Sequence, residues 1–165
     1  MIMLNEKETM FLKDEKKHEQ LCIDKYNEYA QKATDVELKN LFASLAQKEQ
    51  HHLQTINEML SGKIPNINSS SSGAEQNSKV SNVQSQNSNI SNNANIQNSN
   101  QSLNSDKMLC EDSLATEKYV SSTYDTTIFE FRDANARQVL NHIQKEEQEH
   151  GEAIYNYMNS HGMYN

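Results

Sequence analysis

The chain has 165 residues, with 15 basic and 23 acidic side chains and a formal net charge of -8 at pH 7. This length is typical of a single domain, and the acidic balance argues against a surface for nucleic acid or for an anionic membrane. Glycine occurs four times and Pro65 is the one proline. Long helices are therefore allowed almost everywhere along the chain.

The amino-terminal residues and the two cysteines limit where the protein can be located and which cysteine chemistry it can use. The amino-terminal residues turn polar after Leu4, and no run approaches eighteen consecutive apolar residues, so we expect neither a signal peptide nor insertion into a membrane. We therefore expect the protein to be made and kept inside a cell. Cys22 and Cys110 fall within helical patterns at no metal-finger spacing, which favours small buried apolar side chains over a disulfide framework.

The first predicted helix begins near Asn5 and runs to about Ala33. Asn5 with Glu8 three residues later is typical of a capping box, in which each residue binds a free amide of the other. Apolar residues then recur at helical spacing, and Glu15 and Glu19 fall on the same stripe. We therefore expect Glu19 to point into the protein.

The second predicted helix covers about residues 35–61 and follows a very short connection. Thr34 with Glu37 resembles another capping box, so the two helices should lie antiparallel as a hairpin. The second helix carries a sustained heptad-like apolar seam. Glu49 and His52 occupy core positions of that seam.

Between residues 63 and 105 the composition changes to Asn, Ser and Gln, with isolated apolar and no aromatic side chains. Such a segment cannot bury enough apolar surface to offset its ordering entropy, so we expect a disordered linker. The same bias is typical of self-associating tracts, and this alternative stays open. A flexible chain of that length spans roughly 35 Å, enough to recross a helix about 40 Å long.

Two further helices are predicted after the linker. The third begins near Asp106 and carries Glu117 in the middle of its apolar stripe. Asp133 can cap the fourth after another tight turn. The inner face of this last helix carries Glu147 and His150, and the helix should end around residue 160.

The two hairpins, residues 5–62 and 106–162, repeat one pattern at a spacing of 98 residues. In each hairpin a Glu is followed by a Tyr seven residues later and by a Glu-x-x-His that begins thirty residues later. The corresponding residues are Glu19, Tyr26, Glu49 and His52 in the first hairpin, and Glu117, Tyr124, Glu147 and His150 in the second. Because each hairpin is amphipathic, the two should pack into one all-α antiparallel four-helix bundle over residues 1–165.

Such a bundle should bring the six Glu and His residues of the repeat together at mid-height. Four carboxylates in an apolar core repel one another and need compensating cations, which two divalent ions would supply. Carboxylate bridges with one imidazole per ion suit iron or manganese. The alternative is a metal-free network in which the six side chains bind one another. The candidate ligands are Glu19, Glu49, His52, Glu117, Glu147 and His150.

Other polar residues near the six candidate ligands have different predicted roles. Tyr26 and Tyr124 lie two turns from the inward glutamates, where they either donate hydrogen bonds to the ligands or fill the core as aromatic rings. Four more titratable residues are interpreted as surface or helix-end residues rather than ligands: Glu15, His18, His51 and Glu146.

The residues of both hairpins together resemble the Coat F family of bacterial spore coat proteins, within the ferritin-like, rubrerythrin-type superfamily. The segments that carry this resemblance are 14–19, 49–52, 117–120, 137–151 and 162–164, with Tyr26, Ala30 and Tyr124. The resemblance implies an endospore-forming bacterium, synthesis in the mother cell and deposition in the spore coat. It also implies other coat proteins, and further copies of the chain, as partners.

Two hypotheses of different classes follow. The first is a structural coat component that retains a dinuclear Fe or Mn site. The second is a di-metal oxidoreductase that acts as a ferroxidase, peroxidase or manganese catalase and protects against oxidants or metals. The long Asn- and Ser-rich insertion departs from the family pattern, which argues against a compact ferritin-type cage.

Overall fold

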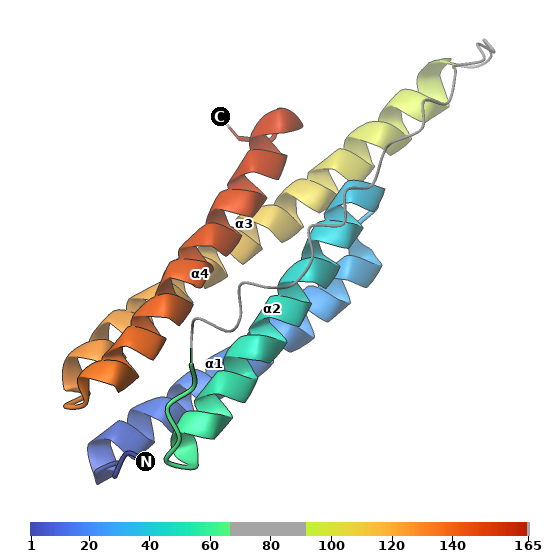
Figure 1. Ribbon diagram of the computed structural model, residues 1–165. Helices are drawn as coiled ribbons and strands as arrows, with labels where there is room; N and C mark the ends of the chain where they lie inside the picture. Colours follow the sequence, from blue (N-terminus) through green and yellow to red (C-terminus); the bar gives the residue numbers. More distant parts are fainter. Residues whose placement is uncertain (67–91, 165) are drawn as a thin grey trace.

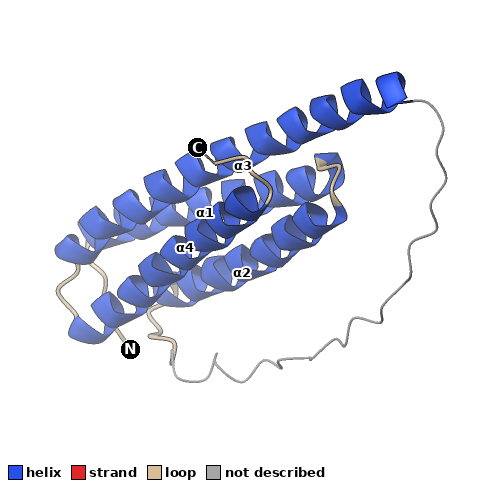
Figure 2. Ribbon diagram, turned by 90° about the horizontal axis from the view of Figure 1, so that it is seen from above, coloured by secondary structure: helices blue, strands red, loops and turns tan. Residues whose placement is uncertain are grey.

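The computed structural model describes residues 1–66 and 92–164. These residues form four helices, α1 (Glu6–Lys32), α2 (Val36–Leu60), α3 (Asn92–Glu130) and α4 (Ala134–Ser160), and no strand. Figures 1 and 2 show α1 antiparallel to α2 and α3 antiparallel to α4, with the two pairs side by side; α1 contacts α3 and α2 contacts α4. The predicted all-α bundle of four helices is therefore confirmed. Within the described ranges, no helix combines the length and apolarity needed to cross a bilayer.

Local capping explains where the helices begin. Asn5 and Glu8 form the predicted capping box, because each side chain accepts a hydrogen bond of 2.8 Å from the backbone amide of the other. Asp133 caps α4 as predicted, accepting from the amides of Asn135 and Ala136, each at 2.9 Å. These caps satisfy amides that the first turn of a helix leaves without partners.

The predicted cap of α2 is wrong by one residue. Asp35, not Thr34, caps this helix, since its carboxylate accepts from the amide of Leu38 at 3.1 Å. Thr34 instead contacts Asp106 of α3. The buried Asp106 carboxylate accepts from the Thr34 amide at 2.8 Å, the Thr34 hydroxyl at 2.7 Å and the Asp35 amide at 3.0 Å. A carboxylate of the second hairpin thus closes the turn of the first.

Replacing Asp106 by Ala should lower the free energy of unfolding by roughly 1–3 kcal/mol, because two backbone amides and one hydroxyl lose a buried acceptor. Urea denaturation followed by circular dichroism measures this change. Asp125→Ala is the matched control, since Asp125 is exposed on the same helix. Equal midpoints for the two variants would show that the Asp106 contacts contribute nothing net.

Helix α3 begins earlier than predicted, at Asn92 rather than near Asp106. Residues 92–105 contain no glycine or proline, and a helix that tertiary packing has already nucleated extends at little cost per residue. The predicted linker over 63–105 was therefore wrong for residues 92–105, which are helical. Residues 67–91 lie outside the described part of the chain, so their predicted disorder stays a prediction.

Limited proteolysis tests that prediction. Because residues 63–91 offer few apolar side chains, protease should cut there first. The two fragments should then co-elute in size exclusion, since α1 packs on α3 and α2 on α4 without need of the connection. Fragments that separate without denaturant, or a connection as resistant as the helices, would contradict this expectation.

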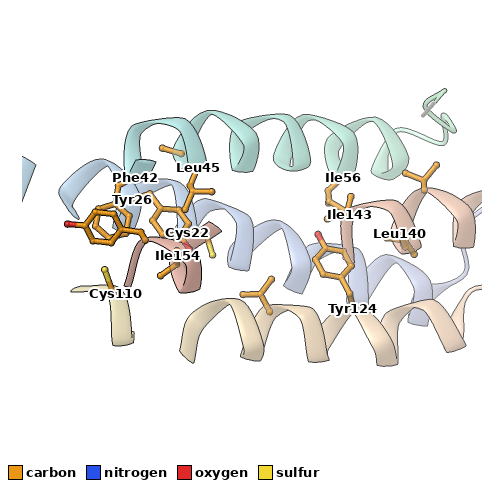
Figure 3. Close-up of a cluster of buried hydrophobic side chains, with 14 of the residues drawn as sticks. Cys22, Tyr26, Phe42, Leu45, Ile56, Cys110, Tyr124, Leu140, Ile143 and Ile154 are labelled. Atoms are coloured by element: carbon orange, nitrogen blue, oxygen red, sulfur yellow. The ribbon is translucent and has the colours of Figure 1, made fainter. Parts of the chain in front are cut away.

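The apolar core lies in two groups along the bundle. Figure 3 shows Tyr26, Phe42, Leu45 and Ile154 grouped toward one end, and Ile56, Leu140 and Ile143 toward the other. In α2 the residues Glu49 and His52 fall between Leu45 and Ile56, and in α4 the residues Glu147 and His150 fall between Ile143 and Ile154. The fold therefore places its inward polar side chains between two apolar layers.

Candidate metal centre

All six candidate ligands are buried in the middle of the bundle. On α2 and α4 the Glu and His of each Glu-x-x-His are three residues apart, so both point to the same face of their helix. Helices α1 and α3 each add one glutamate. The exposed fractions are 0% for Glu19, Glu49, Glu147 and His150 and 3% for His52 and Glu117. The structure thus brings together every residue that the repeat pattern singled out.

The six residues form two overlapping groups of four. Glu19, Glu49, His52 and Glu147 form one, and in it one potential ligand atom per residue lies within 4.8 Å of the others. The second group keeps Glu49 and Glu147 and replaces the other two by Glu117 and His150, within the same limit. Two carboxylates are therefore shared between two donor sets.

The shared carboxylates present one oxygen to each histidine. Glu49 places Oε2 at 3.1 Å from His52 Nδ1 and Oε1 at 2.9 Å from His150 Nδ1. Glu147 places Oε1 at 2.9 Å from His52 Nδ1 and Oε2 at 3.6 Å from His150 Nδ1. Each carboxylate therefore spans the space between the two rings, as a bridging ligand would.

The two imidazoles stack with ring centroids 5.4 Å apart and planes 15° from parallel. Both turn Nδ1 toward the carboxylates, but the outer nitrogens have different surroundings. His52 Nε2 lies 3.1 Å from Oε2 of Glu146. His150 Nε2 is buried and has no hydrogen-bond partner among the described residues.

Each buried tyrosine of the repeat donates a hydrogen bond across to the opposite hairpin. The Tyr26 hydroxyl donates to Glu117 and the Tyr124 hydroxyl donates to Glu19. Burial and the charge of these carboxylates raise the pKa of both phenols, so the hydroxyls keep the protons that they donate. Both tyrosines also belong to the apolar core. Each one therefore donates a hydrogen bond and also fills the core, which were the two interpretations drawn from the sequence.

Without metal, the four carboxyl groups divide into two kinds. Burial raises the pKa of Glu19 well above its ordinary value, and burial with the neighbouring Glu147 charge raises the pKa of Glu117 to about 11. Burial acts in the same direction on Glu49 and Glu147, but the two histidines outweigh it, through hydrogen bonds to Glu49 and close ion pairs with Glu147, and lower both pKa values. The pKa shifts thus favour the neutral form of Glu19 and Glu117 and the ionised form of Glu49 and Glu147.

The two histidines offset the negative charge of the ionised carboxylates. Burial would lower the pKa of His52 and of His150, but hydrogen bonds and charges of the surrounding carboxylates outweigh it and raise both. The raised pKa values favour imidazolium forms of His52 and His150, which face the carboxylates of Glu49 and Glu147. The metal-free cluster is close to neutral overall, which explains how an apolar core accommodates it.

Several polar atoms of the cluster nevertheless accept or donate no hydrogen bond within the described residues. They are one oxygen each of Glu19 and Glu117, both oxygens of Glu147, and His150 Nε2. Buried polar atoms without hydrogen bonds are rare and call for an explanation such as an ion. The donor set of four carboxylates and two imidazoles could hold metal ions.

The interpretation of Glu15 as a surface or helix-end residue is wrong. This residue is buried, and its carboxylate accepts from Thr127 at 2.6 Å and from Thr123 at 3.0 Å, with His18 Nδ1 at 3.2 Å. Its place on the apolar stripe, one turn before Glu19, was the signal that indicated burial.

Glu146 also departs from its predicted surface role. It is half-buried, and the same oxygen that contacts His52 lies 3.4 Å from His142 Nε2. Helical periodicity could not reveal this contact, because Glu146 lies on the flank of α4 rather than on its inner stripe. His51 is exposed, as predicted.

A cavity of 480 Å³ lies between α2 and α4 beside the cluster. Its lining includes His51, His52, His142 and Glu146. Through His52, solvent space thus reaches the edge of an otherwise enclosed polar centre.

Both cysteines are buried and neither forms a disulfide. Burial and the charges of the nearby glutamates raise the pKa of the Cys22 thiol, and burial raises that of Cys110 to about 12. The predicted role as small buried side chains is confirmed for both.

Fold and site together define an all-helical four-helix protein with a buried acidic and histidine cluster that could hold metal ions. The family model described as Coat F domain matches residues 105–165, which span most of α3 and all of α4. Over these residues the chain is similar to the Coat F domain, and the resemblance noted in the sequence is confirmed there. No curated protein and no solved structure matches the chain.

Proposed function

We propose that the protein is a component of the bacterial spore coat and that its bundle holds two divalent iron or manganese ions. The Coat F match supports the coat assignment. The two donor sets that share Glu49 and Glu147 support the ion pair. The ferritin-like ancestry and the internal repeat, both predicted from the sequence, belong to this proposal.

Each ion would take one glutamate and one histidine of its own. Glu19 and His52 would hold the first ion, Glu117 and His150 the second, and Glu49 and Glu147 both. Tyr26 and Tyr124 orient Glu117 and Glu19 by hydrogen bonds, and the apolar layers keep bulk water away. Iron or manganese bound in this way would supply one-electron chemistry toward oxygen or peroxide.

Elemental analysis of protein purified without chelator tests the ion pair, with about two ions per chain expected. A double Glu49→Gln, Glu147→Gln variant sets the background, and Glu149→Gln is the control for an exposed carboxylate. Wild-type metal content equal to that background would contradict metal binding.

Fractionation of spores that produce a tagged chain tests the location separately. The chain should appear in the coat fraction together with other coat proteins, after synthesis in the mother cell. Its absence from that fraction would contradict the coat role whatever the metal content.

A di-metal oxidoreductase is the second candidate, favoured by the cavity that reaches His52. A small oxidant could approach the cluster from this side. Oxygen or peroxide consumption by the Fe(II)- or Mn(II)-loaded protein should then exceed that of the Glu49→Gln, Glu147→Gln variant. Equal rates with full metal occupancy in the wild type would leave the structural coat role.

A further inference from the structure

The two halves of the cluster differ behind their histidines. Shifting Glu146 by the repeat spacing of 98 residues leads to Lys48, the residue before Glu49. Glu146 is half-buried and lies against His52 Nε2 at 3.1 Å, whereas Lys48 is exposed. An acidic side chain thus supports one histidine, and the corresponding position of the other hairpin carries a cation.

The difference matters because an imidazole that binds metal through one nitrogen carries its proton on the other. With Nδ1 facing the carboxylates, His52 can donate its Nε2 proton to Glu146. His150 Nε2 has no acceptor among the described residues, and a lysine ammonium cannot serve as one.

We infer that the position formed by Glu19 and His52 binds a divalent cation more tightly than the position formed by Glu117 and His150, and that Glu146 sets this difference. The inference rests on the proposed metal binding. Glu146 acts as a positioning residue, since it touches the far nitrogen of His52 and not the shared carboxylates.

Two effects of Glu146 strengthen cation binding at the position formed by Glu19 and His52. A carboxylate on the far nitrogen fixes the tautomer and orientation of a metal-binding histidine and makes it a stronger donor, and its loss typically costs 10- to 100-fold in metal affinity. The negative charge of Glu146 also favours a cation on its side of the cluster.

The experiment must separate the two positions, because the shared glutamates couple them and stepwise binding alone would not identify which fills first. His150→Ala leaves the Glu19 and His52 position, and His52→Ala leaves the other. Mn(II) titration by calorimetry should give an affinity for His150→Ala that is roughly 10-fold or more above that for His52→Ala.

Adding Glu146→Gln to each of the two histidine variants isolates the effect of Glu146 on Mn(II) affinity. It should weaken Mn(II) binding roughly 10-fold in His150→Ala and leave His52→Ala unchanged. Glu149→Gln is the matched control, because Glu149 is an exposed carboxylate of the same helix that pairs with Lys145 at 3.0 Å. It should change neither affinity.

Glu146→Gln in the otherwise native chain covers the case in which a histidine variant does not fold. It should weaken the first equivalent of Mn(II) and not the second. Equal affinities at the two positions, or equal weakening of both by Glu146→Gln, would overturn the inference while metal binding stands. No Mn(II) binding by the wild type would overturn the proposed function as well.

Discussion

Replacing Glu147 by Gln should leave the protein folded but reduce its metal content from about two ions per chain to well below one. Glu147 belongs to both donor sets, so this one substitution would remove a ligand charge from both proposed ion positions. Elemental analysis after dialysis against Mn(II) or Fe(II) measures the loss. Retention of both ions would show that Glu147 is not a shared ligand.

The same variant should also change the stability of the metal-free protein. The sequence suggested that losing a carboxylate would relieve repulsion, but the structure pairs Glu147 with both histidines and lowers its pKa. We therefore expect Glu147→Gln to lower the free energy of unfolding by roughly 1–3 kcal/mol, because two buried imidazolium groups lose a charged partner.

Glu117→Gln is the matched comparison for that stability change. Because its pKa of about 11 keeps Glu117 neutral without metal, the neutral amide should leave metal-free stability almost unchanged while removing one ligand. Urea denaturation of both variants in chelator checks this difference. Equal destabilisation by both variants would contradict the assignment of charges within the cluster.

Metal binding should release protons and strengthen steeply with pH. The raised pKa values favour the protonated forms of Glu19, Glu117, His52 and His150 in the metal-free protein. Two divalent cations would displace these four protons, and their charge would balance four carboxylates. Ligands must lose protons before they bind metal, so affinity rises with pH while these groups remain protonated in the free protein.

Calorimetry in two buffers of different ionisation enthalpy counts the protons released. Release of two protons per ion corresponds to an affinity that changes by about two powers of ten per pH unit for each ion. Release near zero would mean that the free cluster is already deprotonated, contrary to the charges that the structure assigns to it.

Sequence reasoning predicted much of the site because the informative residues repeat in register. One Glu-x-x-His carries little information, but two copies with matching upstream Glu and Tyr residues constrain which faces point inward. Helical periodicity then places Glu19 and Glu117 in the core, where the structure has them. The tyrosine contacts across hairpins could not be predicted, since they depend on which helices are neighbours.

The errors have identifiable physical causes. Glu15 was interpreted as a surface or helix-end residue although it lies on the apolar stripe, and Thr123 and Thr127 supply its hydrogen bonds from another helix. The start of α3 was placed too late because the composition of residues 92–105 resembles a linker. Composition does not measure how far a packed helix extends.

The buried thiols limit how this chain can be joined to its neighbours in an assembled layer. The sequence contains two cysteines, and in the folded protein both are enclosed and hold their protons firmly. Disulfide exchange requires an accessible thiolate. A reductant should therefore not release the folded protein from a coat, because this chain forms no disulfide with its neighbours. Any covalent link to another chain must use a different kind of side chain.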